Sequence, residues 1–403
     1  MNRVGGKTAQ TTEWFRSNGQ HQLQHSDNAI ELCTTLRTRQ RISFTRDVFS
    51  KENDLLESIF ERDPVLIVMS RSISNLYGAR IASYLRRNCN EPRHRILTLN
   101  CSEQNKTMDT VLDICREACD LCLGRRAKIV AIGGGVCCDL CGFAAAIYRR
   151  GISHIKIPTT LLGLVDAGVA TKNGVNLDGR KNAIGTFYVP EHSIIDPEFL
   201  NTLPERHFRS GLSEICKIAI VFHPSLFATL WKHMDSLRGS GTRLIHSAKE
   251  FVYETAQSHA RLLSEDLYET ATYQRILDFG HTFSPFIERT THYQVTHGEA
   301  VAVDMALSTI ISHQIGRISG CESDRILDLL AALRLFPTEL TLDAGDLWRS
   351  LADIEAHRNG SLNMPLPTGV GTHFFLKSKE GLELGSVQAA LNEWQRRLCV
   401  ASA

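Results

Sequence analysis

The stretch AKIVAIGGGVCCDLCGFAAAIYRRG, residues 127–151, joins an apolar run to a glycine turn and then to a second apolar segment. The run predicts a buried strand, and the segment after Gly133, Gly134 and Gly135 predicts the start of a helix. A helix N-terminus behind such a turn favours an anion, for example the phosphates of a dinucleotide. The spacing is not GxGxxG, and a tight turn without a ligand is the alternative. The junction is typical of one unit of a parallel α/β sheet.

The same alternation continues on both sides of this junction. Apolar runs at 63–70, 94–100 and 192–200, and another within 152–168, predict further strands, with segments of helical spacing between the earlier ones. Alternating strands and helices predict a parallel sheet with helices on its faces. After about residue 197, long stretches with apolar residues three to four apart predict helices. We therefore predict a Rossmann-like α/β domain over residues 1–196, including an N-terminal extension, and a mainly α-helical domain over 197–403.

Composition and charge exclude some classes of protein. The chain has 403 residues, 43% hydrophobic and 22% charged, with a formal net charge of +1. Because neither sign dominates, we expect no nucleic-acid partner and no membrane partner held by charge. No apolar run is long enough to span a bilayer, and the first twenty residues lack the apolar core of a secretory signal. We expect a cytoplasmic protein.

The twelve cysteines include two pairs with the spacing of zinc ligands. Cys119-x-x-Cys122 and Cys138-x-x-Cys141 are separated by fifteen residues, as in a zinc ribbon. The second pair, however, falls in the first turns of a predicted packed helix. We therefore predict that these cysteines are reduced, buried core residues, and neither zinc ligands nor disulfides.

Two histidines and a carboxylate are candidate metal ligands. Glu214 and Lys217 lie three apart in GLSEICK, where a surface ion pair is the commoner outcome, but apolar neighbours favour a buried role. His281 lies in LDFGHTFSP and His297 in VTHGEAVAVD. A lone histidine is usually structural, whereas two histidines and a carboxylate that converge suit a divalent metal with an open position.

Basic and acidic residues between these motifs are candidates for a substrate site. Lys172, Lys181 and Asn182 lie in TKNGVNLDGRKN, which predicts a basic loop that is either solvated or a clamp for a phosphate. Asp166 is an acid among apolar residues in LLGLVDAG. Such a placement is costly unless the carboxylate is paired, so it indicates function.

Taken together, these segments resemble the dehydroquinate synthase-like sugar phosphate cyclases. The resemblance rests on motifs that keep their order and spacing at residues 133–151, 157–176, 179–187, 202–219, 278–285 and 297–308. It implies an N-terminal NAD-binding α/β domain, a C-terminal helical domain, a homodimer, and NAD with one zinc or cobalt ion as cofactors.

The resemblance also implies roles for individual residues. Its metal ligands would be Glu214, His281 and His297. Its NAD contacts would be Ser70, Glu103, Lys106, Gly134, Gly135, Asp139, Thr159, Thr160, Lys172, Lys181 and Thr202. Its substrate and catalytic residues would be Asp166, Lys172, Lys181, Asn182, Lys217 and Arg150, the last reaching the phosphate from the partner subunit. At Ser70 the family usually has an aspartate, so the affinity for NAD is expected to differ.

Four positions bear on the substrate. Dehydroquinate synthase has an asparagine in place of Asp278, a histidine in place of Pro285, and an arginine near Gln274 that holds the substrate carboxylate. Without that guanidinium a carboxylate loses its bidentate partner, which implies a substrate that lacks one. The motifs are similar to 2-epi-5-epi-valiolone synthases, which cyclise sedoheptulose 7-phosphate. Glu299 favours this branch, because desmethyl-4-deoxygadusol synthases typically have histidine there.

The implied activity is that of a phosphate-eliminating carbon–oxygen lyase. Sedoheptulose 7-phosphate would be cyclised to 2-epi-5-epi-valiolone through transient oxidation by NAD, loss of phosphate, reduction and an intramolecular aldol reaction. Synthases of 2-epi-valiolone, desmethyl-4-deoxygadusol and dehydroquinate are alternatives. An alcohol dehydrogenase that uses NAD and a metal would have little use for a phosphate clamp. A non-catalytic homologue would be expected to lose metal ligands or lysines.

Overall fold

A computed structural model shows how the junction at residues 127–151 folds. It forms the strand β6 (Lys128–Gly133), the glycine turn and the helix α4 (Gly135–Ile147). The structure describes residues 21–26, 29–34, 37–60, 63–88, 94–238, 242–269, 272, 274–357 and 360–401. The chain divides into two units, Met1–Gln40 and Arg41–Ala403. The domain boundary at residues 196 and 197 stays a prediction.

In the first unit the described elements are two antiparallel strands. They are β1 (His21–Ser26) and β2 (Ala29–Thr34). Residues 1–20, which belong to the predicted extension, lie outside the described residues.

The second unit begins with a six-stranded parallel sheet, in the order β3-β10-β7-β6-β4-β5. Besides β6, its strands are β3 (Arg41–Phe44), β4 (Val65–Ser70), β5 (His94–Leu99), β7 (Ser153–Pro158) and β10 (His192–Ile195). Every residue of β4 and β6 is buried, which is typical of a parallel sheet covered on both faces. The predicted α/β sheet is confirmed, and β3 is a strand that the sequence did not predict.

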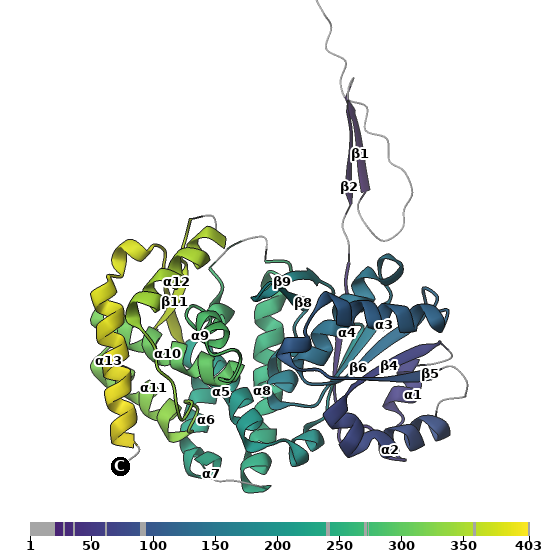
Figure 1. Ribbon diagram of the computed structural model, residues 1–403, viewed down its shortest axis with the longest axis horizontal. Helices are drawn as coiled ribbons and strands as arrows, with labels where there is room; N and C mark the ends of the chain where they lie inside the picture. The colour runs from purple at the N-terminus through teal and green to yellow at the C-terminus, as the bar shows by residue number, and fades with distance from the viewer. Residues whose placement is uncertain are drawn as a thin grey trace, which may run out of the picture. The chain divides into compact units, whose positions relative to one another are not determined.

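Helices cover both faces of this sheet, as Figure 1 shows. They are α1 (Leu55–Phe60), α2 (Arg71–Asn88), α3 (Met108–Asp120) and α4. Leu66 and Val68 of β4 pack with α3 and α4, whereas Val65 and Ile67 pack with α1 and α2. This division follows from the two-residue period of a strand, in which successive side chains point to opposite faces.

The predicted basic loop is wrong, because these residues form a hairpin. Strands β8 (Lys172–Leu177) and β9 (Arg180–Phe187) pair antiparallel. Asp178 and Gly179 turn between them with φ of 48° and 75°. An Asp-Gly pair accepts positive φ at both positions, as a tight hairpin turn requires, and this signal was missed.

The rest of the second unit is mainly α-helical, as predicted. Its helices are α5 (Glu205–Val221), α6 (Pro224–Lys232), α7 (Met234–Arg238), α8 (Thr242–Glu265), α9 (Ser284–Thr290), α10 (His297–Gln314), α11 (Gly320–Ala332), α12 (Ala344–His357) and α13 (Leu384–Ala401). Short helical turns occur at Glu103–Asn105, Tyr148–Arg150, Gly163–Ala167, Pro197–Thr202, Ile276–Asp278 and Lys379–Gly381. The hairpin of β11 (Met364–Gly369) and β12 (Thr372–Leu376) was not predicted.

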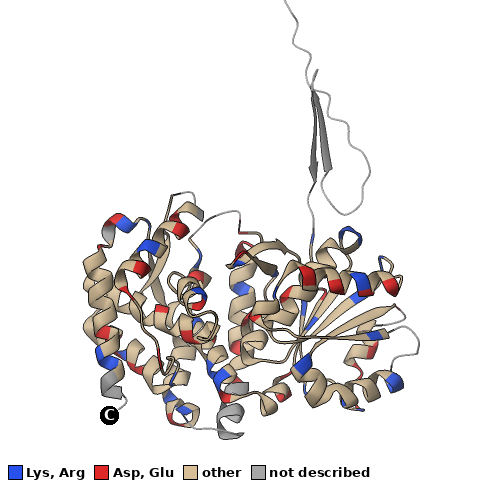
Figure 2. Cartoon of the chain, viewed as in Figure 1, with Lys and Arg blue, Asp and Glu red and all other residues tan. Residues whose placement is uncertain are grey.

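Helix α10 forms the centre of this helical part. Its residues from Ala300 to Ser312 are all buried, and its apolar side chains belong to one core cluster with those of α5 and α13. Figure 2 shows that positive and negative residues are interspersed over the described part of the second unit. Within that part, no helix is long and apolar enough to cross a membrane.

The cysteines differ in burial, although the nine whose side chains the structure describes are all free. Cys138 and Cys141 are buried as predicted, and Cys137 and Cys216 are buried as well. Cys119 and Cys122 are exposed, so their predicted place in the core is wrong. The reason is their position at the end of α3, where the chain turns at the surface.

Candidate active site

A cavity of about 530 Å³ lies where β6 ends, and both the sheet and the helices line it. Strand β5 lies on one side of β4, and β6 lies on the other, so the chain direction across the sheet reverses between β4 and β6. In open parallel sheets, ligands bind beyond the carboxyl ends of the strands at such a point. The topology therefore supports a ligand site here.

The glycine turn forms one wall of the cavity. Gly134 is the N-cap of α4, and Gly134 and Gly135 both line the cavity. A Cβ atom on Gly133 would lie 2.6 Å from Cβ of Cys137, so only glycine allows the helix to start so close to the strand. The first N–H groups of α4 can therefore bind an anion in the cavity.

A buried lysine connects this turn to the hairpin. Lys106 is 3% exposed, and its Nζ lies 2.5 Å from Oδ2 of Asp139 and 2.6 Å from Oδ1 of Asn182. Glu103 accepts a hydrogen bond of 2.9 Å from Nδ2 of Asn176 in β8. These contacts fix the position of the hairpin relative to α4, and they bring together four of the predicted cofactor and substrate residues.

The structure brings together the three predicted metal ligands. Glu214 lies on α5, His281 precedes α9 and His297 is the first residue of α10, yet one ligand atom of each lies within 4.8 Å of the others. Nε2 of His297 lies 3.4 Å from Oε1 of Glu214, and Nε2 of His281 lies 3.9 Å from it. Nδ1 of His281 contacts the carbonyl of Phe279 at 3.1 Å, so Nδ1–H donates and Nε2 keeps its lone pair.

The electrostatics of this group fit a divalent cation. The carboxylate of Glu214 is buried, and Lys217 Nζ pairs with its Oε2 at 2.5 Å, which leaves Oε1 facing the two histidines. Burial opposes ionisation, but Lys217 and the two histidines hold the pKa of Glu214 well below its usual range. Burial and Lys217 lower the pKa of His281 to about 4. An ionised carboxylate beside a neutral imidazole is a donor set that zinc or cobalt accepts.

Asp166 has a partner that the sequence did not reveal. It lies in the turn Gly163–Ala167, and its Oδ1 is 3.4 Å from Nδ1 of His259 on α8. The same Nδ1 contacts the carbonyl of Val165 at 3.1 Å. The side chain of His259 lines the cavity, and its second ring nitrogen, Nε2, takes part in neither of these two contacts. Burial lowers the pKa of His259. Hence His259 presents a neutral imidazole to the cavity.

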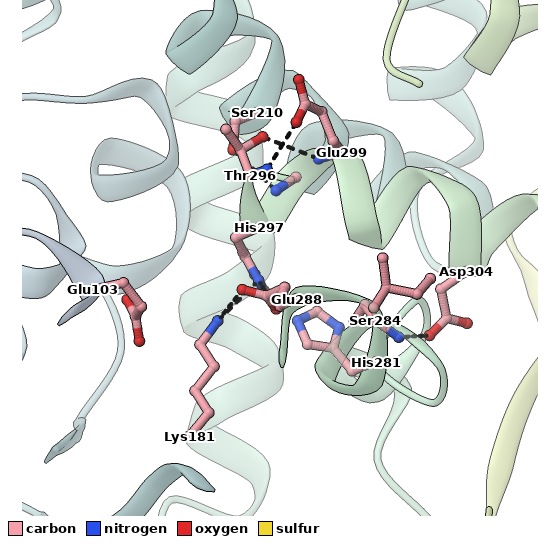
Figure 3. Close-up of polar contacts among 12 residues, drawn as sticks. Glu103, Lys181, Ser210, His281, Ser284, Glu288, Thr296, His297, Glu299 and Asp304 are labelled. Atoms are coloured by element: carbon pink, nitrogen blue, oxygen red, sulfur yellow. Dashed lines mark hydrogen bonds and ion pairs between the residues drawn. The ribbon is translucent and has the colours of Figure 1, made fainter. Parts of the chain in front are cut away.

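The two lysines of the hairpin both lie in the cavity, and each is paired with an acid. Lys172 forms an ion pair with Glu269, and Lys181 forms one of 2.5 Å with Glu288. Figure 3 shows Lys181 reaching across to Glu288, which also contacts His297. Glu288 was missed, although an acid beside Phe286 and Ile287 was a signal of the same kind as Asp166.

Of the residues proposed to distinguish substrates, some line the cavity and others do not. Asp278 and Pro285 line the cavity, but Gln274 is exposed and does not. Arg275 is next to Gln274, and its guanidinium pairs with Glu269 and, at 2.8 Å, with Asp278. This guanidinium is therefore already engaged by two carboxylates.

Other predicted residues lie outside the lining of this cavity. They are Ser70, Thr159, Thr202 and Arg150. Ser70 is buried and bonds Oγ of Ser72 at 3.1 Å, and Oγ1 of Thr202 bonds the hydroxyl of Tyr77 at 2.7 Å. Arg150 is exposed, with a φ of 65°.

Glu299 has a structural partner set. It completes a capping box with Thr296 at the start of α10 and forms a 2.7 Å ion pair with Arg206. The carboxylate therefore fixes the helix start next to His297, and it does not line the cavity.

Comparison with known families agrees with this fold and site. Residues 96–210 match the family model for the 3-dehydroquinate synthase N-terminal domain, and residues 211–353 match that for the C-terminal domain. The chain therefore belongs to the 3-dehydroquinate synthase family. The predicted family and fold class are confirmed.

Individual relatives are more specific. A 2-epi-5-epi-valiolone synthase of Streptomyces albus is 37% identical over 363 residues, which cover 87% of this chain and 88% of the relative. A demethyl-4-deoxygadusol synthase of Trichormus variabilis is 32% identical over 350 residues, 85% of each chain. The solved structure of ValA, a 2-epi-5-epi-valiolone synthase of Streptomyces hygroscopicus with NAD⁺ and Zn²⁺ bound, superposes with a TM-score of 0.82 at 32% identity, over 90% of this chain and 98% of ValA.

Proposed function

We propose that this protein is a sugar phosphate cyclase that converts sedoheptulose 7-phosphate to 2-epi-5-epi-valiolone with release of phosphate. The observation that carries the proposal is one cavity lined both by His281 and His297, which converge on the buried Glu214, and by the paired lysines Lys172 and Lys181. The similarity to 2-epi-5-epi-valiolone synthases over most of the chain supports the same reaction.

NAD and one zinc or cobalt ion are the proposed cofactors. Glu214, His281 and His297 would hold the ion, which supplies Lewis acidity that makes a bound alcohol easier to deprotonate. NAD, bound at the turn of Gly134 and Gly135, supplies reversible hydride transfer. Its further contacts would be Ser70, Glu103, Lys106, Asp139, Thr159, Thr160, Lys172, Lys181 and Thr202.

The chain's own groups would bind and orient the sugar. Lys172, Lys181 and Asn182 would hold the phosphate, since two ammonium groups and an amide can donate to its oxygens. Asp166 and Lys217 would orient the hydroxyls near the metal group, which consists of Glu214, His281 and His297. Arg150, which lies outside the cavity of its own subunit, would reach the phosphate of the partner subunit in a homodimer.

The charges near Asp278 support a substrate without a carboxylate. Asp278 lines the cavity, and the nearby guanidinium of Arg275 is engaged by Asp278 and Glu269. An added carboxylate would meet a negative side chain at this wall, where no guanidinium of the described residues is unengaged. This argues against dehydroquinate synthase activity, which requires a carboxylated heptulosonate phosphate.

The test is to supply sedoheptulose 7-phosphate with catalytic NAD and either zinc or cobalt. We expect phosphate release in excess of the NAD present, and a product that NMR identifies as 2-epi-5-epi-valiolone. The matched control is a carboxylated heptulosonate phosphate, which should release no phosphate. The proposal fails if only the carboxylated sugar reacts or if NAD is consumed one for one. Another C7 cyclitol would place the chain in a sister branch.

A further inference from the structure

We propose that Glu288 is a positioning residue that couples metal binding to Lys181, so that the metal group and the phosphate lysine depend on one shared carboxylate. The inference rests on the proposed metal site. It goes further, because it assigns a role to a residue that does not belong to the metal group and does not act on the substrate.

Glu288 is placed between the imidazole of His297 and the ammonium group of Lys181. It is 3% exposed, and its two oxygens bond different partners. Oε1 lies 3.0 Å from Nδ1 of His297, and Oε2 lies 2.5 Å from Nζ of Lys181 (Figure 3). The two partners are themselves only 3.4 Å apart. With both oxygens engaged, the carboxylate is shared by the two sides of the site.

The contact with His297 decides which ring nitrogen faces the metal group. A carboxylate at Nδ1 keeps the proton on that nitrogen, and Nε2 is then the nitrogen with a lone pair. Nε2 is also the atom 3.4 Å from Glu214, inside the metal group. Glu288 therefore fixes both the orientation and the tautomer of His297 that a metal ion needs.

The contact between Glu288 and Lys181 affects how strongly a divalent cation is repelled at the proposed metal site. The ammonium lies next to the His297 ring, so it would repel any cation bound on the other side of the ring. The negative charge of Glu288 compensates it at direct contact. Removing this charge while keeping the lysine should weaken metal binding, and removing both should restore part of it.

The hairpin is held on its other side as well. Asn182 follows Lys181 in β9 and bonds Lys106, which pairs with Asp139 behind the glycine turn. Through Glu288, α9 contacts Lys181 at one side of the hairpin. The other side of the hairpin is fixed, through Asn182 and Lys106, to Asp139 on α4. This position explains why one buried acid can affect both sides of the cavity.

The experiment measures Co²⁺ binding to metal-free protein without any sugar phosphate, by titration and by the visible absorption of the bound ion. We expect Glu288→Gln to lower the affinity about 10-fold and Glu288→Ala by about 10- to 100-fold, with a changed absorption spectrum. Lys181→Met alone should not weaken binding. The double variant Glu288→Gln with Lys181→Met should bind more tightly than Glu288→Gln.

The matched control is Glu205→Gln, which removes an acid paired with Arg209 outside the cavity and should leave Co²⁺ affinity unchanged. Circular dichroism checks that each variant folds. Unchanged affinity in both Glu288 variants would overturn the inference, and so would a double variant no tighter than Glu288→Gln. Wild-type protein that binds Co²⁺ but does not cyclise the sugar would refute only the proposed substrate. Wild-type protein that binds no Co²⁺ would refute both proposals.

Discussion

Glu214 holds a negative charge in a place that excludes water, and the residues around it make this possible. It is 1% exposed, and the cation of Lys217 lies one helical turn away on the same helix. A buried carboxylate is costly unless positive charge compensates it; Lys217 does so at Oε2, while Oε1 faces the two histidines and is the oxygen that the proposed metal ion would meet. The two histidines that complete the group each keep Nε2 directed toward it.

Replacing His281 with alanine should abolish turnover, because two protein ligands hold a divalent ion far less tightly than three. Metal content of the purified variant, measured by atomic emission, should fall with the activity. His373→Ala is the control, since this histidine is exposed on β12 outside the cavity. Full activity and full metal content in His281→Ala would show that the metal group is assigned wrongly.

Asp304 should make the protein less stable as pH rises. It is fully buried and accepts hydrogen bonds from the backbone of Phe283 and Ser284 and from Ser308. Burial raises its pKa from 3.8 to about 6, so the folded state binds the proton more tightly than the unfolded state does. The stabilisation is present below the unfolded pKa and is lost as pH rises through about 6, to the extent of about 3 kcal/mol.

The measurement is urea unfolding of wild type and Asp304→Asn between about pH 4 and pH 7. The free energy of unfolding of the variant, relative to wild type, should increase over this interval, because asparagine does not titrate. A difference that stays constant with pH would contradict the raised pKa of Asp304.

A role at the site could be predicted for single charged residues whose neighbours in the sequence are apolar. Asp166 and the pair Glu214 and Lys217 stood out as charges among apolar residues, and all three lie at the site. His259 gave no such signal, because a histidine in a long helix is usually structural. Its place at the cavity is set by contacts with Val165 and Asp166, which are far from it in the chain.

At the scale of elements, the metal group depends on how closely two helices approach. A Cβ atom on Gly298, at the start of α10, would lie 2.0 Å from the carbonyl oxygen of Ser210 on α5. The contact is with backbone, which cannot move aside as a side chain can. The two helices therefore meet at a glycine that directly follows His297, and on α5 the contact lies one turn before Glu214.

Gly298→Ala should separate the helices and displace His297 from Glu214. We expect a loss of roughly 1–3 kcal/mol of stability from overpacking, together with weaker Co²⁺ binding. Gly385→Ala in α13 is the control, because a Cβ atom there meets nothing within 4 Å and should be neutral or slightly stabilising. Equal thermal stability and equal Co²⁺ affinity in Gly298→Ala and wild type would refute this account of the helix contact.

Most elements could be predicted because their hydrophobic period is strong. Helix α3, for example, buries Val111, Ile114 and Ala118 three to four residues apart, and periodicity finds such a face. Strand β6 is buried throughout and stands out instead as a short apolar run. The hairpin of β8 and β9 was missed because glycine, asparagine and lysine give little strand signal. Its strands form through the turn at Asp178 and Gly179 and through the contacts of Lys106 and Asn182.

At the scale of the molecule, the residues of the site come from two parts of the second unit, the sheet with its hairpin and the helical part. The glycine turn, Asp166 and the two lysines come with the sheet, and the metal group comes with the helices. The sequence could supply the two lists of residues, but not the fact that one cavity joins them. That fact depends on packing between segments that are distant in the chain.

The burial of the thiols can be tested across the whole molecule. Under native conditions iodoacetamide should label Cys119, Cys122 and Cys321, which are exposed. Cys138, Cys141 and Cys216 should react only after denaturation, because they are buried and burial raises the pKa of each thiol, to about 12 for Cys138. Peptide mapping by mass spectrometry identifies each site. Rapid native labelling of Cys138 or Cys141 would contradict the packing of α4 on the sheet.

The pairing of Lys172 with Glu269 and of Lys181 with Glu288 makes ligand binding an exchange. A phosphate that enters the proposed site must compete with carboxylates that are part of the chain. A phosphate dianion brings two negative charges, which match the two carboxylates that the lysines give up, whereas a neutral sugar brings no charge to either lysine. In the proposed site, an unphosphorylated sugar would therefore leave the lysines paired with Glu269 and Glu288, and selectivity for phosphate would come from competition with these acids as much as from attraction.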